Sequence, residues 1–412
     1  MTSQDVARIF FSWPLTGDTM LTLVFSCIVL LLAFPTIMFV LECLLGLHYR
    51  TKHENSLSAD EISAAVLVPA HNEALVIAKT LENLKTQLGP TDKVVVVADN
   101  CSDDTAEIVR QYGFTALERS SDTERGKGYA LAFGMEHLKS LETHPDVVVI
   151  VDADCLLEDN AFALLKTRVI AWRRPVQACY LMLSGDVDRL AVKVSEFAFM
   201  VKNKIRLRGL ARMRMPVPLT GTGMAFPWKA ISEAQLATGD IVEDMRLGVE
   251  LAEKGMGARY CDEALVYSYF PTSEAAEATQ RERWEHGHLS TLRQFAPRLL
   301  KRAIKDRSIE AFGMMLDLII PPLTLLILVI GGAWLVFLAY GFVSGSWMFF
   351  EVSTHYLTAL LFSILLTWFC HAQHILSAKA LVHIPIYMFS KIAIYIAYVV
   401  RKQTKWIRTD RD

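Results

Sequence analysis

The sequence predicts an α/β protein with a Rossmann-like, mostly parallel sheet, flanked by transmembrane helices. Strand-like and helix-like segments alternate between about residues 60 and 290, the pattern of a sheet with helices wound on both faces. Apolar residues make up 52% of the 412-residue chain. Their excess lies at about residues 19–47 and 314–400 rather than in the middle. We therefore expect one α/β domain held between membrane segments.

The overall composition excludes some classes of protein. The formal charge is -2, so nothing in the composition indicates nucleic-acid binding. The seven cysteines are odd in number and include no C-x-x-C pair, which is typical of free thiols in a reducing compartment.

The first apolar segment, residues 21–40, is uncharged and about 20 residues long, enough to cross a bilayer as a helix. Pro35 lies inside it, which membrane helices tolerate. A cleaved signal peptide is the alternative. The leader has a single positive charge, Arg8, and no small-residue cleavage site follows, so we expect a retained anchor. Arg50 and Lys52 follow closely, and the positive-inside rule then places the middle domain in the cytoplasm.

The middle domain shows strands and helices in the order of a doubly wound sheet. The expected strands are 64–69, 93–98 and 147–151, and the expected helices are 74–88, 103–111 and 127–138. The five β-branched residues at 147–151 indicate a strand that is buried on both faces. Ligands of such sheets bind outside the carboxyl ends of the strands, so polar residues there are candidates for function.

Three further apolar segments follow, at 314–340, 356–376 and 381–400. If all three crossed the membrane, the tail 401–412 would end outside, although its five basic residues belong inside. Lys391 lies in the middle of the last segment. We therefore expect that segment to be interfacial or re-entrant.

Two stretches, 202–214 and 293–307, are basic and partly apolar. Each is either a solvated face or a helix that lies on an anionic membrane surface. The second comes just before a span, which favours the membrane interface. The expected organisation is an N-terminal membrane anchor at 1–50, an α/β domain at 60–290, an interfacial basic helix at 291–312, and C-terminal membrane segments with a basic tail at 313–412.

Carboxylates appear abruptly at the ends of the predicted strands. Asp152 and Asp154 follow strand 147–151, and such a pair suits Mg²⁺ or Mn²⁺, which can in turn hold a diphosphate. A solvated Asp-rich turn is the alternative. Asp99 follows strand 93–98, where it is either an acceptor for the base or ribose of a nucleotide or the cap of the next helix.

Other motifs have the residue types of an anion-binding and acid–base site. Lys127, between two glycines at a helix start, suits a phosphate, although a plain loop is the alternative. Glu243 and Asp244 begin a helix, either as dipole partners or as a general base. Trp284 with nearby Arg and Gln can stack on a sugar and bind a diphosphate. His286 and His288 do not share a helix face, so we favour a non-metal role for both.

The ordered set of motifs P-x-x-N-E, A-D-N-C-S-D-D-T, G-K-G, D-A-D, G-T-G, E-D and Q-R-E-R-W spans about residues 64–290. This set resembles membrane-integrated glycosyltransferases of family 2, the relatives of cellulose, hyaluronan and poly-N-acetylglucosamine synthases. The tail 406–411 is similar to their W-x-R-T-x-R. The resemblance implies a GT-A fold, a nucleotide-sugar donor that is usually UDP-linked, Mg²⁺ or Mn²⁺, inversion at the anomeric carbon, and a place in the inner membrane.

The resemblance also assigns residues to the donor. Asp99 would contact the uracil or ribose, helped by Pro69 and Glu73. Lys127 and Asp152 would contact the rest of the donor.

For the metal and the acceptor, the resemblance places Asp154 at the cation, beside Asp152. Asp244, next to Glu243, would deprotonate the acceptor hydroxyl. The residues implied at the leaving diphosphate and the acceptor sugar are Gln280, Arg283 and Trp284. The implied acceptor is a lipid-linked or growing polysaccharide, with membrane lipids around it and polysaccharide-export proteins as further partners.

Val242 departs from the pattern, because processive members have Thr there, so processivity stays open. One alternative is a transferase that adds a single sugar to a lipid, similar to ceramide glucosyltransferases. Another is a membrane scaffold that binds a nucleotide sugar without turnover, although a scaffold has no need of a base. A transporter is disfavoured because the strong spans are too few.

Overall fold

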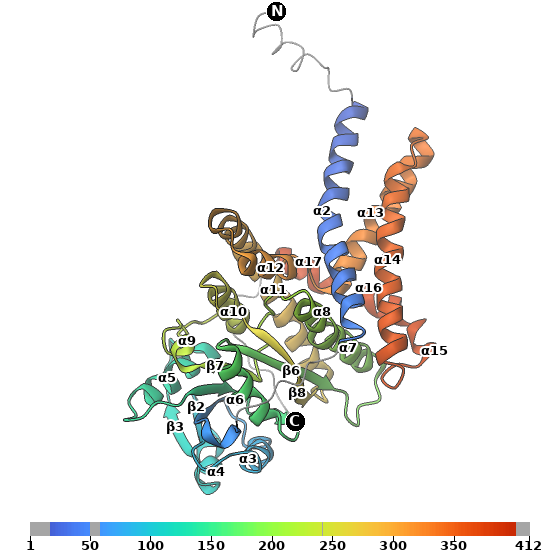
Figure 1. The fold of residues 1–412 in the computed structure, drawn as a ribbon. Helices are drawn as coiled ribbons and strands as arrows, with labels where there is room; N and C mark the ends of the chain where they lie inside the picture. The colour runs from blue at the N-terminus through green and yellow to red at the C-terminus, as the bar shows by residue number, and fades with distance from the viewer. Residues whose placement is uncertain (1–16, 50–57, 241, 401–412) are drawn as a thin grey trace, which may run out of the picture.

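The computed structural model describes residues 17–49, 58–240 and 242–400. Within these residues, an eight-stranded sheet forms the α/β domain, and three long apolar helices stand together on one side of it (Figure 1). The strands are β1 Ala64–Ala70, β2 Lys93–Asp99, β3 Thr115–Arg119, β4 Val147–Ile150, β5 Leu156–Leu157, β6 Val176–Leu183, β7 Met224–Pro227 and β8 Arg259–Tyr269. Their order across the sheet is β3-β2-β1-β4-β7-β6-β8-β5.

Helices cover both faces of the sheet, as the alternating pattern predicts. The side chains of β4 show why: Val148 and Ile150 belong to an apolar cluster with α5, whereas Val147 and Val149 belong to a second cluster with α3 and α6. The helices of this domain are α3 Ile77–Lys85, α4 Thr105–Gln111, α5 Lys127–Lys139, α6 Ala161–Trp172, α7 Leu190–Met200, α8 Leu207–Arg212, α9 Trp228–Ser232, α10 Glu243–Glu253 and α11 Glu274–Asp306. A strand enclosed on both faces needs apolar residues at every position.

The three predicted strands match β1, β2 and β4 to within one residue at each end. Helix α5 also matches its prediction closely. Helix α3 begins three residues later than expected, because Asn72 adopts a positive φ of 55° and the chain turns before Ile77.

The prediction of a mostly parallel sheet holds for one half of it. Strands β3, β2, β1 and β4 run parallel. Beyond β4, the sheet is mixed: β7 is antiparallel to both β4 and β6, and β5 is antiparallel to β8, while β6 and β8 are parallel. Strands of two to four residues, such as β5 and β7, are too short for periodicity to reveal.

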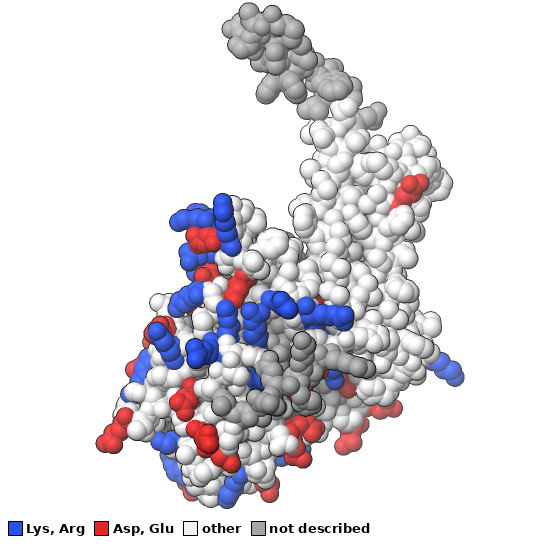
Figure 2. Space-filling view, in the orientation of Figure 1, with Lys and Arg blue, Asp and Glu red and all other residues white. Residues whose placement is uncertain are grey.

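The N-terminal apolar segment forms the single helix α2, Gly17–Gly46, which continues past Pro35. It is long and apolar enough to span a membrane, and it contains the predicted segment 21–40. Figure 2 shows that the column of apolar helices is almost free of charged side chains on the visible face, and that Lys and Arg gather where the column meets the α/β domain. Arg50, Lys52 and the tail 401–412 lie outside the described residues.

The predicted span at 314–340 is found as a candidate span, but it begins at Leu323 and not near Met314. The chain forms two helices there, α12 Ile309–Leu318 and α13 Leu323–Ser344, and only α13 is a candidate span. Pro321 and Pro322 separate them, because proline lacks the backbone N–H and disfavours helix in the residue before it. The next candidate span is α14, Met348–His371, which overlaps the predicted segment 356–376.

The last apolar segment does not form a membrane-length helix. It divides into α15 Ala378–Leu381, α16 Ile384–Ser390 and α17 Ile392–Val400. Lys391, between α16 and α17, pairs with Glu285 of α11 at 2.9 Å. His286 Nε2 donates a hydrogen bond to the Ile394 carbonyl at 3.0 Å. The segment therefore packs along α11, and its interfacial or re-entrant placement stays a prediction.

The basic stretch 202–214 is neither a simple solvated face nor a membrane-facing helix throughout. Arg206, at the end of a π-helical turn Val201–Arg206, is buried and pairs with Glu42 of α2 at 2.5 Å and Asp317 of α12 at 2.6 Å. Arg208 makes two hydrogen bonds to Asp262. The basic residues here thus include internal ion-pair partners that join the α/β domain to the first span.

Candidate active site

The carboxyl ends of β1, β2 and β4 meet at one edge of the sheet, because these strands are parallel neighbours. Short hydrogen bonds join the loops after β1 and β2. His71 Nδ1 donates to the Asp99 carbonyl at 2.6 Å, and the Glu73 amide donates to Thr105 Oγ1 at 2.9 Å. Pro69 lies in register with Val97 one step before this edge. Pro69, Glu73 and Asp99 are therefore neighbours, as the motif order implies.

Asp99 is held by a residue that the sequence did not single out. Arg119 Nη1 lies 2.7 Å from Asp99 Oδ1, and both side chains are buried. Asn100 Nδ2 donates to the same oxygen at 3.1 Å, and Arg119 also pairs with Glu124 at 2.9 Å. Arg119 ends β3, a strand that was not predicted, so only the fold reveals this contact. The helix-cap alternative for Asp99 is not seen: α4 begins after Asp104, and Asp103 Oδ1 accepts from the Thr105 amide at 3.1 Å.

Lys127 forms the centre of the site. Its Nζ lies 2.5 Å from Asp152 Oδ1 and 3.7 Å from Glu243 Oε1, and it donates to the Gly221 carbonyl at 2.8 Å. The first turn of α5, the end of β4 and the first turn of α10 are thereby brought together around one ammonium group.

Asp244 faces the same point from α10. A Cβ atom built on Gly221 would lie 3.5 Å from Asp244 Oδ2, 3.6 Å from Lys127 Nζ and 3.9 Å from Asp152 Oδ2. Gly221 has a φ of +92°, which L-residues rarely adopt. The glycine therefore allows the backbone to pass among three charged groups and leaves open space between them.

Buried hydrogen bonds fix this glycine loop in place. The Asp152 amide donates to Thr222 Oγ1 at 3.1 Å. Gln177, fully buried in β6, accepts from the Thr220 amide at 3.0 Å and donates to the Thr222 carbonyl at 3.0 Å. Gln177 carries no motif, and its role became visible only in the folded chain.

Burial changes the acidity of the carboxyl groups around Lys127. It raises the pKa of Glu243 to about 7, although the Lys127 ammonium opposes the shift. It also raises the pKa of Asp244, again against Lys127. For Lys127, burial acts to lower the pKa, but Asp152 and Glu243 raise it more, so the ammonium stays charged. The site thus combines one cation with two carboxyls that accept protons more readily than usual.

The residues after β4 fit a divalent cation. Ligand atoms of Asp152, Asp154 and Cys155 lie within 4.8 Å of one another. The two carboxylates are partly exposed and offer the hard oxygen atoms that Mg²⁺ and Mn²⁺ prefer. Burial raises the pKa of the Cys155 thiol well above its usual value, so it stays protonated and is a poor ligand. The donor set is therefore the carboxylate pair.

The three remaining predicted residues lie on helix α11, which contacts the start of α10. Gly287 of α11 allows close approach to Val242 at the start of α10, since a Cβ there would lie 2.6 Å from Val242 Cγ1. The Trp284 ring lies 5.8 Å from the Phe199 ring of α7. Gln280 is buried and Arg283 is half-buried on the same helix. The contact through Gly287 thus joins the helix that carries Gln280, Arg283 and Trp284 to the helix that carries Asp244.

Comparison with known proteins identifies the family. The family model described as Glycosyltransferase like family 2 matches residues 63–287, more than half of the chain. The chain therefore belongs to this family, as its ordered motifs predict.

Two relatives show the same kinship. A probable glycosyltransferase of Bacillus subtilis (strain 168), YdaM, is 27% identical over 274 residues, which cover 61% of this chain and 62% of that protein. A probable glucomannan 4-beta-mannosyltransferase of Oryza sativa subsp. japonica is 26% identical over 251 residues, covering 57% of this chain and 45% of that protein. The chain thus spans about three fifths of one relative and less than half of the other.

A solved structure shares the fold. The mannosyltransferase PcManGT from Pyrobaculum calidifontis, solved in complex with GDP-Man and Mn²⁺, is 17% identical and matches with a TM-score of 0.50. The match covers 83% of this chain and 99% of that chain. Likeness at this identity bears on the fold alone, and it confirms the expected GT-A architecture.

Proposed function

We propose that this protein is an inverting hexosyltransferase that moves a sugar from a UDP-sugar to a lipid-linked or growing polysaccharide acceptor at a membrane. The observation that carries the proposal is the convergence of Lys127, Asp152 and Asp244 around Gly221, at the carboxyl edge of the sheet. A half-buried carboxylate that faces a cation across open space suits displacement of a diphosphate by a hydroxyl group.

Asp244, Lys127 and Asp152 have separate roles in the sugar transfer. Asp244 takes the proton of the acceptor hydroxyl. At the same time, the hydroxyl oxygen of the acceptor forms a bond to the anomeric carbon from the side opposite the leaving group. The bond from that carbon to the diphosphate breaks, and the leaving group keeps the electron pair. The Lys127 ammonium stabilises this developing negative charge, and Asp152 orients the ammonium. Attack from the opposite side inverts the anomeric configuration.

Other residues bind and align the substrates. Asp99, with Pro69 and Glu73, forms the nucleoside end of the donor site, and Arg119 fixes the Asp99 carboxylate. Gln280, Arg283 and Trp284 on α11 contact the diphosphate and the acceptor sugar. Asp154, with Asp152, would hold Mg²⁺ or Mn²⁺, which supplies electrostatic stabilisation of the leaving diphosphate when bound.

The membrane helices support a cytoplasmic site. Helices α13 and α14 are the two C-terminal candidate spans. If both cross and the shorter apolar helices after them do not, the chain returns to the side from which it entered. We propose that the α/β domain and the basic sequence 401–412 share that side, in accord with the positive-inside rule. We place both on the cytoplasmic side of a plasma membrane, where nucleotide sugars are available to a cell-surface glycan pathway.

Release of nucleoside diphosphate tests the proposal directly. The full chain in lipid nanodiscs would be incubated with Mn²⁺ and, in turn, UDP-glucose, UDP-N-acetylglucosamine, UDP-galactose, UDP-glucuronate and GDP-mannose, with a lipid extract as acceptor. Turnover with one donor supports the transferase. Tight nucleotide binding without turnover from any donor would favour the scaffold alternative. A ladder of products indicates processive synthesis, whereas one added sugar indicates a single-sugar transferase, and this outcome decides the processivity that Val242 leaves open.

Removal of one metal ligand is expected to weaken cation binding. Asp154→Asn should raise the dissociation constant of Mn²⁺ at least about 10-fold. Loss of a residue that only hydrogen-bonds to a metal ligand already weakens metal binding by about this factor, and loss of a ligand itself should weaken it more. Electron paramagnetic resonance of free Mn²⁺ measures this without turnover. The matched control is Asp159→Asn, an exposed acid five residues on, which should bind Mn²⁺ as the unmodified protein does. Equal affinity in both variants would remove Asp154 from the site.

A methyl group at Gly221 is expected to block the donor. Gly221→Ala should lose about 1–3 kcal/mol of stability from backbone strain, and it should also lose UDP binding because the methyl lies among the three charged groups. Gly255→Ala is the matched control: its φ is +72° and nothing lies within 4 Å of the added Cβ. Calorimetric titration with UDP should show loss of binding in the first variant alone. Retained binding in Gly221→Ala would place the donor elsewhere.

A further inference from the structure

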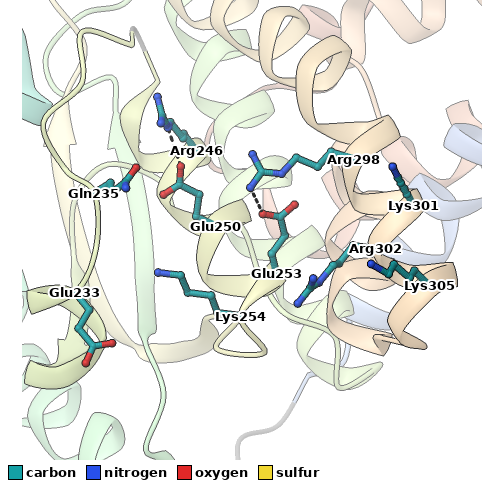
Figure 3. A pocket seen from close by; sticks show the side chains of 10 residues that line it. All are labelled: Glu233, Gln235, Arg246, Glu250, Glu253, Lys254, Arg298, Lys301, Arg302 and Lys305. Carbon is teal, nitrogen blue, oxygen red and sulfur yellow. Dashed lines mark hydrogen bonds and ion pairs between the residues drawn. The ribbon is translucent and has the colours of Figure 1, made fainter.

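A charged groove of about 600 Å³ lies between α10 and the second half of α11, apart from the site around Lys127 (Figure 3). Six basic side chains and three acidic ones line it. The basic residues are Arg246, Lys254, Arg298, Lys301, Arg302 and Lys305. This excess of positive charge suits an anionic ligand.

Two of the groove's three acids, Glu250 and Glu253, form ion pairs with its arginines. Arg298 pairs with Glu253 at 2.5 Å, and Arg246 pairs with Glu250 at 2.9 Å. In Figure 3, the Arg298–Glu253 pair links α11 to α10, and the Arg246–Glu250 pair links one turn of α10 to the next. Within the part of the chain that the structure describes, no ion pair involves the three lysines of the groove, Lys254, Lys301 and Lys305. Three ammonium groups therefore remain for a ligand.

Exposed apolar side chains lie along the helical hairpin that α11 forms with α12. Leu300 and Ile304, four residues apart on α11, are 44% and 71% exposed, and Ile309 and Phe312 of α12 are 75% and 44% exposed. At 3.6 residues per turn, Leu300 and Ile304 share a face that lies beside the face of Lys301 and Lys305. Large apolar side chains this exposed next to lysines are typical of a helix at a membrane interface.

The hairpin lies close to the bilayer. Only Ile319–Pro322 separate the end of α12 from Leu323, the first residue of the span α13. Four residues bridge at most about 14 Å. Figure 1 shows α11 and α12 meeting beside α2 above the sheet, and Figure 2 shows Lys and Arg gathered there.

We propose that this groove binds the phosphate headgroup of an anionic phospholipid from the surrounding bilayer. Lys254, Lys301 and Lys305 contact the phosphate. The acyl chains lie along Leu300 and Ile304. The apolar face next to the lysines selects a lipid over a soluble phosphate, because a free anion gains nothing from exposed leucine and isoleucine side chains.

Lipid titration of the full chain in detergent tests this proposal. Phosphatidylglycerol, phosphatidylcholine and glycerol phosphate would be titrated separately and bound ligand counted by native mass spectrometry. The variant is the triple substitution Lys254→Gln, Lys301→Gln and Lys305→Gln. Its matched control removes three exposed lysines from the α/β domain, at Lys85, Lys93 and Lys229.

The expected result is specific binding of phosphatidylglycerol, weakened roughly 100-fold in the groove variant and unchanged in the control, since each lysine near the headgroup contributes about a factor of five. Both variants should melt at the temperature of the unmodified protein without lipid, because these lysines are exposed. Equal binding of phosphatidylcholine, or equal weakening in the control, would overturn the proposal. Binding of glycerol phosphate as tight as that of the lipid would overturn it too, in favour of a soluble ligand.

Discussion

Asp244→Asn is expected to lower kcat about 10²- to 10⁴-fold, the usual contribution of a positioned general base. Asparagine has nearly the same shape but cannot take the acceptor proton. Donor binding should change little, because Lys127 and Asp152 are left in place. Initial rates of UDP release in the presence of acceptor, together with the dissociation constant of UDP, separate the two effects.

Asp240→Asn is the matched control for that substitution. Asp240 lies four residues earlier, carries the same charge and pairs with Arg246 at 2.8 Å on a largely exposed surface. Its replacement should leave kcat unchanged. If Asp244→Asn keeps full turnover, Asp244 is not the base and Glu243, whose pKa is raised to about 7, becomes the candidate.

Arg206→Met is expected to be the most destabilising single change outside the site, by about 3–5 kcal/mol. The arginine pairs with Glu42 at 2.5 Å and Asp317 at 2.6 Å, and its removal leaves two buried carboxyls without their cation. Methionine retains most of the apolar volume, so the loss reports charge rather than packing. Thermal melting of the detergent-solubilised protein measures the loss.

Two further variants show whether charge is the cause. Adding Glu42→Gln and Asp317→Asn to Arg206→Met should restore most of the stability, because a neutral group costs less to bury than an unpaired charge. Arg212→Met, at an exposed position in the same basic stretch, should shift stability by less than about 0.5 kcal/mol. If the triple variant is no more stable than Arg206→Met, packing outweighs charge here.

Sequence patterns predicted those elements whose structure depends on neighbouring residues in the chain. The valine run before Asp152 indicated a buried strand, and the structure places β4 there, enclosed on both faces. The Pro321-Pro322 pair was also visible in the sequence. Giving it less weight than hydropathy placed the start of the span at Met314, whereas α13 begins at Leu323. Hydropathy measures solvent preference, whereas a helix ends where the backbone cannot continue.

The contacts missing from the sequence prediction join residues far apart in the chain. Arg206 lies 164 residues from Glu42 and 111 residues from Asp317. No periodicity connects positions at such separations, so the basic stretch resembled a solvated or membrane-facing surface. Lys127 and Asp152 were each selected from their own motif, but their 2.5 Å contact follows only from the sheet that brings α5 beside β4.

The charged triad of Glu42, Arg206 and Asp317 also has a mechanical consequence. Apolar helix faces slide past one another with little change in energy, whereas two carboxylates on one guanidinium permit a single alignment. The triad joins the first span, the α/β domain and the helix before the second span. If α2 and α13 cross a bilayer, the triad fixes the height of the proposed site above it within the chain itself, and a lipid-linked acceptor would meet the site at one constant depth.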